Sequence, residues 1–192
     1  MSPQPESSLS LGTVYAIAPQ PADEASTRWI EAGPIAIGVE YRELDPESLL
    51  ATYADNPQSM EDILKAGGAT FVDEGVSFHV KSTEDGHEYL RFDVFEGEPH
   101  YHYIRKASGG EAISNHIIPF DLAAHGDMFE WVLRCLRERL PAMLGEVAAE
   151  GLVRDLDPER LTRAVKEAEI LARGARENLE KVRQAIGESA QG

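Results

Sequence analysis

Residues Val72 to Ile118, VDEGVSFHVKSTEDGHEYLRFDVFEGEPHYHYIRKASGGEAISNHII, alternate between apolar and polar side chains over most of their length. Because neighbouring side chains of a β-strand point to opposite faces, a period of two predicts strands with one buried face. The runs Val72 to Lys81 and His87 to Glu96 are separated by the turn-forming residues Ser82 to Gly86. This pattern predicts a β-hairpin.

The two faces of this hairpin differ in chemistry. If Lys81 lies opposite His87, the apolar residues of the two strands share one face, namely Val76, Phe78, Val80, Leu90, Phe92 and Val94. The other face then carries Ser77, His79, Tyr89, Arg91 and Asp93. A solvated sheet face is usually rich in Lys, Glu and Thr, so this set of imidazole, phenol, guanidinium and carboxylate groups suggests a site.

The motif His100-Tyr101-His102 adds two imidazoles to the same polar face. A two-residue turn at Gly97-Glu98 would place Asp93 opposite His102. The last strand, Ile113 to Ile118, has two possible registers, and only one keeps its apolar residues beside the tyrosines. That register predicts that His116 lies directly across from His102, at the ~5 Å Cβ separation of a cross-strand pair.

Helix signals lie on both sides of this sheet. Asp45-Pro46 combines an N-cap with a proline at the first helical position and predicts a helix, followed by a second short helix over 58–66. Asp127 caps a helix that should bend or divide at Pro141, with its apolar stripe continuing to Gly151. A last helix is predicted from about Pro158 to Ile186.

The predicted fold class is α+β. Trp29 to Glu43 alternates as a further strand, which gives an antiparallel sheet of about five strands, with helices packed on one face and a long C-terminal helix. The expected organisation is a flexible N-terminal tail over 1–27, an α+β domain over 28–151, and an amphipathic C-terminal helix over 152–192.

Composition narrows the possible partners. The chain has 192 residues and a formal net charge of -16, which argues against binding to nucleic acid or to anionic membranes. Cys135 is the single cysteine, so no intramolecular disulfide can form. No run reaches the ~20 apolar residues that span a bilayer, and no signal peptide is evident, so a cytoplasmic protein is expected.

The leading hypothesis is a small enzyme or ligand-binding protein with a metal site on the polar face. His100, His102 and His116 would supply three nitrogen ligands for a divalent transition metal such as Zn, Fe, Mn or Ni. Asp93 would be either a carboxylate ligand or a hydrogen-bond acceptor behind one of the imidazoles. Asp93, Arg91 and Tyr89 are the candidate catalytic residues, and Arg91 and Tyr89 would orient a small-molecule ligand.

Two alternatives remain open. In the first, the site is free of metal, His102 acts as a general base oriented by Asp93, and Arg91 holds an anionic group of the substrate. In the second, the protein is a non-catalytic interaction or scaffold protein that acts through its C-terminal helix, which is also the candidate interface of a homodimer.

Overall fold

The computed structural model describes residues 12–15, 18–54, 61, 72–106 and 113–189. They contain one seven-stranded sheet in the order β1-β7-β6-β5-β4-β3-β2, in which every neighbouring pair is antiparallel. Its strands are β1 (Thr13–Tyr15), β2 (Arg28–Ala32), β3 (Ile35–Leu44), β4 (Asp73–Ser82), β5 (Glu88–Phe95), β6 (His100–Lys106) and β7 (Ile113–Pro119). The predicted α+β class is confirmed, with more strands than the five expected.

Some predictions fall outside the described residues. Of the second short helix, over 58–66, only Glu61 is described, and residues 1–11 of the predicted tail are likewise not described. Within the segment predicted to be a flexible tail, however, Thr13–Tyr15 forms β1 and pairs with β7 at one edge of the sheet. Residues 18–27 then lead to β2, at the opposite edge.

The run Trp29 to Glu43, predicted as one strand, is a hairpin of β2 and β3. The chain turns at Gly33 and Pro34, and Gly33 has a φ of 74°. Only glycine adopts this region of φ freely, so the Gly-Pro pair is the signal that the periodicity argument missed. Strand β3 therefore pairs with β4 along its whole length, from Ile35 opposite Ser82 to Leu44 opposite Asp73.

The predicted registers of the central hairpins are wrong by two residues. Phe78 pairs with Phe92, and Asp93 pairs with His100 rather than with His102. A shift of two keeps every side chain on its predicted face, because the period of a strand is two. A β-bulge where Lys81 pairs with Glu88 is the one local irregularity between β4 and β5.

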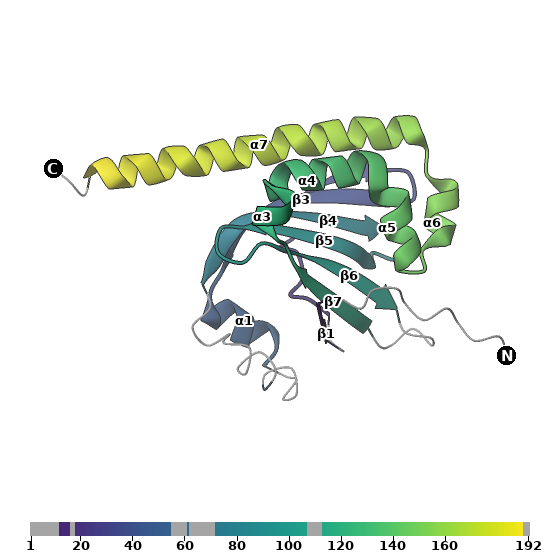
Figure 1. The fold of residues 1–192 in the computed structure, drawn as a ribbon, viewed down its shortest axis with the longest axis horizontal. Coiled ribbons are helices and arrows are strands. Elements are labelled where there is room, and N and C mark those ends of the chain that lie inside the picture. The colour runs from purple at the N-terminus through teal and green to yellow at the C-terminus, as the bar shows by residue number, and fades with distance from the viewer. Residues whose placement is uncertain (1–11, 16–17, 55–60, 62–71, 107–112, 190–192) are drawn as a thin grey trace.

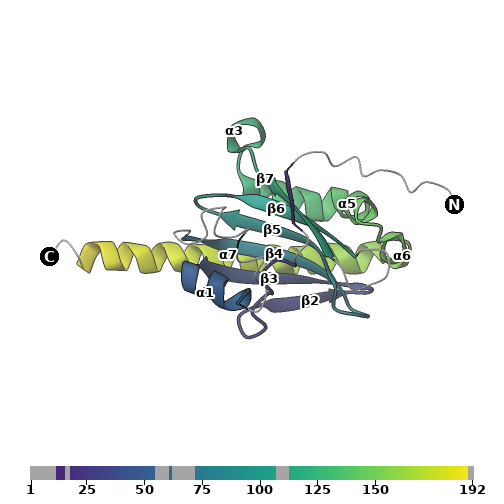
Figure 2. The same cartoon turned by 90° about the horizontal axis from the view of Figure 1, so that it is seen from below.

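Helices cover one face of the sheet, and Figures 1 and 2 show α4, α5 and α7 on the side opposite to α1. The helical segments are α1 (Pro46–Thr52), α3 (Leu122–His125), α4 (Met128–Arg134), the π-helix η1 (Cys135–Arg139), α5 (Leu140–Glu146), α6 (Glu150–Asp155) and α7 (Pro158–Ser189). The predicted N-caps Asp45 and Asp127 accept hydrogen bonds from the backbone N–H of Ser48 and Glu130. Among the described residues, no helix is both long and apolar enough to cross a membrane.

Pro141 explains an interruption in the helix that begins at Met128. The five residues before Leu140 form a π-helical turn. Proline has no N–H, and its ring crowds the carbonyl group of residue i−4, here Arg137, so the helix widens at this point. The helix then ends at Glu146, short of the predicted Gly151.

The apolar core lies between the helices and the predicted apolar face. Phe78, Leu90 and Phe92 of the sheet pack in one buried cluster with Phe129 of α4 and with the first half of α7. The residues that α7 contributes to this cluster are Leu161, Ala164, Val165, Ala168 and Ala172. The C-terminal helix therefore begins as part of the domain core, and Figure 1 shows its later turns extending beyond the sheet.

The other face of the sheet is polar and also buried. Residues 18–27 cross it from the side of β1 to β2, and the carbonyl oxygen of Gln20 accepts a hydrogen bond from Arg91 Nη1 at 2.7 Å. Helix α1 holds this crossing segment from outside, because Thr52 and Tyr53 hydrogen-bond to Gln20 and Ala18. We refer to residues 18–27 as the strap.

A close approach at Gly38 provides a test of the polar face. A Cβ atom at this position would lie 2.6 Å from the Trp29 ring. We expect Gly38→Ala to lower the free energy of unfolding by about 1–3 kcal/mol, the usual effect of overpacking, as measured by urea denaturation.

The matched control is Gly174→Ala in α7, where an added Cβ meets no atom within 4 Å. It should stabilise the protein by up to about 1 kcal/mol, because alanine is the better helix former. Equal effects of the two substitutions would contradict the packing described for Gly38.

Candidate metal centre

Asp93, His100 and His102 converge at the middle of the polar face. Asp93 on β5 pairs with His100 on β6, and Arg91 pairs with His102. The Nε2 atoms of His102 and His100 lie 3.0 Å and 3.3 Å from the same oxygen, Oδ2 of Asp93. One candidate ligand atom of each residue lies within 4.8 Å of the other two, close enough to hold a metal ion.

The opposite nitrogen of each imidazole is held by an oxygen acceptor. Nδ1 of His100 lies 2.7 Å from the carbonyl oxygen of Glu98, and Nδ1 of His102 lies 2.8 Å from Oδ1 of Asn115. A carbonyl oxygen only accepts, so Nδ1 of His100 carries a hydrogen. Such outer hydrogen bonds fix the tautomer and orientation of metal-binding histidines.

The turn before β6 is fixed from a distant strand. The buried carboxylate of Asp73 accepts the backbone N–H groups of Gly97 and Glu98, at 2.9 Å and 2.7 Å. Since the carbonyl group of Glu98 orients His100, Asp73 positions the imidazole indirectly.

Asp93 is ionised. Burial alone would raise its pKa, but hydrogen bonds from His100 and His102, together with their charge, hold the pKa of Asp93 well below its ordinary value. Its second oxygen, Oδ1, accepts a hydrogen bond from the hydroxyl group of Ser77. The carboxylate therefore offers a negative charge to both imidazoles.

The pKa values of the two imidazoles shift in opposite directions. Burial lowers the pKa of both rings. At His100 the hydrogen bond to Asp93 and its charge outweigh burial and raise the pKa, whereas at His102 burial prevails and the pKa is lowered. His100 is therefore the more readily protonated of the two imidazoles.

The predicted position of His116 is wrong. Strand β7 adopts the other register, in which His116 pairs with Tyr103, and Ile118 rather than Ile117 lies beside Tyr101. A slip of one residue moves a side chain to the opposite face. Asn115 consequently takes the place beside His102 that was expected for His116.

Tyr89 and Arg91 were expected to orient a ligand, but in the structure both side chains contact other parts of the protein. Tyr89 packs against the apolar cluster and makes an edge contact with the His87 ring, at a centroid distance of 4.5 Å. Arg91 forms a bidentate ion pair with Glu88 and donates its remaining guanidinium nitrogen to the strap. Every nitrogen of the Arg91 guanidinium is thus already engaged.

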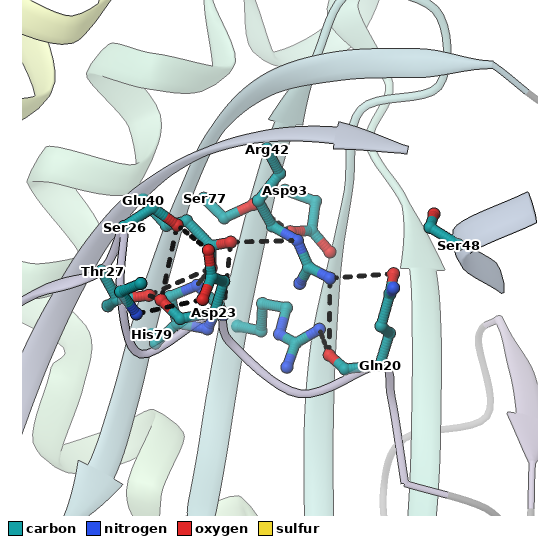
Figure 3. Close-up of polar contacts among 12 residues, drawn as sticks. Gln20, Asp23, Ser26, Thr27, Glu40, Arg42, Ser48, Ser77, His79 and Asp93 are labelled. Atoms are coloured by element: carbon teal, nitrogen blue, oxygen red, sulfur yellow. Dashed lines mark hydrogen bonds and ion pairs between the residues drawn. The ribbon is translucent and has the colours of Figure 1, made fainter. Parts of the chain in front are cut away.

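A second polar network extends from Glu88 across the face. Nδ1 of the fully buried His79 lies 2.7 Å from Glu88, and its Nε2 lies 3.2 Å from Glu40. Burial raises the pKa of Glu88, but the charge of Arg91 and then that of His79 prevail and keep Glu88 ionised. Figure 3 shows that Glu40 also meets the strap, where it accepts a hydrogen bond from Thr27.

The periodicity argument missed several buried polar residues. Ser77 was predicted on this face but was given no role. Asn115 was missed because the predicted register of the last strand put that residue on the opposite face. Glu88 reaches the polar face at the bulge beside Lys81, which alternation cannot reveal. Glu40 could have been predicted on the polar face, because it alternates with the apolar residues of its strand.

These features define an α+β protein whose sheet has one helix-covered apolar face and one buried polar face with a two-histidine, one-carboxylate cluster. The chain belongs to the family described as Domain of unknown function (DUF7700), which matches residues 29–172. That match includes the three cluster residues and Asn115. No curated protein and no solved structure matches the chain.

The buried ion pair gives a stability prediction. Glu88→Gln would leave Arg91, 2% exposed, without its carboxylate partner. We expect the free energy of unfolding to fall by roughly 3–5 kcal/mol, the usual cost of leaving one charge of a buried pair uncompensated.

The control is Asp85→Asn, which removes an exposed ion pair with Lys106. This change should cost about 1 kcal/mol or less, because water screens exposed charges. Denaturation curves at neutral pH compare the two variants, and a Glu88→Gln effect as small as that of Asp85→Asn would contradict the network.

Proposed function

We propose that the protein binds a divalent transition metal ion through Oδ2 of Asp93 and the Nε2 atoms of His100 and His102. The observation that carries this proposal is the orientation of His102. Nδ1 of His102 lies 2.8 Å from Oδ1 of Asn115, and this contact aims Nε2 at Oδ2 of Asp93, 3.0 Å away. An imidazole nitrogen and a carboxylate oxygen held side by side in this way can bind one metal ion together once Nε2 carries no hydrogen.

The spacing of the ligand atoms supports this proposal. Ligands about 2.1 Å from a metal are about 3.0 Å apart at a right angle and about 3.4 Å apart at the tetrahedral angle. The separations of 3.0 Å and 3.3 Å between Oδ2 and the two Nε2 atoms fall in this range. Two histidines and one carboxylate suit Zn, Fe, Mn or Ni.

Three protein ligands leave coordination positions for water or a small molecule. His100, whose side chain is 17% exposed, is the most accessible of the three ligands. A bound divalent ion would acidify a coordinated water molecule or polarise a ligand oxygen. We therefore favour a small metal-dependent enzyme or a metal-dependent ligand-binding protein.

The alternatives have less support. In a metal-free acid–base site, a ring nitrogen must reach the substrate, but both nitrogens of His102 and of His100 already face protein oxygen atoms. In a scaffold acting through the C-terminal helix, α7 would present its apolar side to a partner. Its first half instead packs in the core of its own domain.

Metal analysis of untagged protein tests the proposal. We expect close to one transition metal ion per chain by inductively coupled plasma mass spectrometry. His102→Ala and Asp93→Asn should lose it while keeping the native circular dichroism spectrum. Asn115→Leu should weaken metal affinity by about 10- to 100-fold, the usual effect of removing an outer hydrogen bond.

His116→Ala is the matched control, because His116 lies on the other face of the sheet. It should keep full metal content. A protein that binds no transition metal after incubation with Zn(II), Fe(II), Mn(II) or Ni(II) would refute the proposed site.

Metal affinity should also depend on pH in a defined direction. A metal binds the unprotonated Nε2 of His100, whose pKa is raised by Asp93 in spite of burial. Affinity should therefore fall about tenfold per pH unit below that raised pKa and level off above it. Calorimetric titration of metal into the apoprotein, at several pH values, measures this dependence.

A further inference from the structure

A polar cavity lies on the same face of the sheet, between the strap, β3 and α1. Its volume is about 280 Å³, and its walls include Gln20, Asp23, Glu40, Arg42, Glu43 and Ser48. This is slightly less than the ~300 Å³ at which pockets for drug-sized ligands begin. The cavity is thus suited to a molecule of several non-hydrogen atoms.

Arg42 is the cation in the wall of this cavity, and it is 5% exposed. Among the residues that the structure describes, its guanidinium hydrogen-bonds only to Gln20, through Nη2 at 3.1 Å and 3.5 Å. Its Nε lies 3.8 Å from Glu40, too far for a hydrogen bond. A guanidinium has five N–H donors, so most of those of Arg42 have no acceptor in the described part of the chain.

Arg91 has the carboxylate partner that Arg42 lacks at hydrogen-bond distance. Arg91 makes a bidentate pair with the Glu88 carboxylate and a third bond to the strap. Figure 3 shows Arg42 between Glu40 and Gln20, with Ser48 of α1 beyond them. Burial lowers the pKa of Arg42, and the charge of Arg91 lowers it further, so a negative charge beside it would be favourable.

The acidic residues of the wall limit how much negative charge a ligand could carry. Glu40 accepts from Thr27 and from the backbone of Asp23, and Asp23 accepts from Ser26 and from the backbone of Ala25. Glu43 adds a third carboxylate to the wall, which therefore holds more acidic than basic side chains. A ligand with two negative charges would be repelled, whereas one with a single charge can pair with Arg42.

We propose that this cavity binds a small monocarboxylate, whose two oxygen atoms accept the parallel N–H groups of Arg42. A planar carboxylate matches the guanidinium fork, which is the usual mode of bidentate recognition. The proposal is independent of the metal, because none of the three metal-binding residues lines the cavity.

Propionate is the probe, titrated into metal-free protein, with propylammonium as a cation of similar size and sulfate as a dianion. NMR resonances of arginine Nε–H groups and the thermal midpoint report binding. We expect propionate to shift the Arg42 resonance saturably, with little change at Arg91, and to raise the midpoint. Propylammonium and sulfate should do neither.

Arg42→Lys keeps the charge and removes the fork, so propionate affinity should fall roughly 10- to 100-fold, as expected for a charge-assisted hydrogen bond. Arg28→Lys, at an exposed position on β2, is the matched control and should bind as the wild type does. Metal content should be unchanged in Arg42→Lys, which separates this test from that of the metal site.

The proposal is overturned if propionate leaves the wild-type Arg42 resonance unchanged, or if propylammonium has the same effect. Equal propionate affinity in Arg42→Lys and wild type would also overturn it. If Arg42→Lys does not fold, the wild-type Arg42 resonance and the propylammonium comparison decide the question alone.

Discussion

The ion pair between Arg91 and Glu88 is the interaction on which the polar face depends. Placing a guanidinium and a carboxylate out of water is costly, and their attraction offsets the cost only when the remaining donors and acceptors are satisfied. Here the third guanidinium nitrogen donates to the Gln20 carbonyl group, and Glu88 is shared with His79. The strap therefore covers the polar face and also supplies the backbone carbonyl group that Arg91 needs as an acceptor.

The candidate metal centre lies beside this pair and follows the same rule of charge compensation. Asp93 is buried next to two imidazoles and within the field of Arg91. In the metal-free protein, protonation of His100 would balance the charge of the carboxylate. A metal ion held by Asp93 and the two Nε2 atoms would supply positive charge at the same place.

Several contacts keep these side chains in place from different parts of the chain. Asp73 holds the turn that carries Glu98, Ser77 holds Asp93, and Asn115 holds His102. These contacts come from β4 and β7, on either side of the hairpin that carries the ligands. Such support from stiff neighbouring strands is what a preorganised site requires.

The sequence by itself determined the fold class, the apolar face and the joint placement of Arg91, Asp93, His100 and His102. These follow from side-chain alternation, which survives a register error of two residues. Only the tertiary structure decided the register of β7, the bulge at Glu88 and the burial of the polar face. The physical reason is that pairing energies depend on non-local contacts: two registers of one strand have the same alternation, and only packing against β6, the helices and the strap distinguishes Asn115 from His116 as the neighbour of His102.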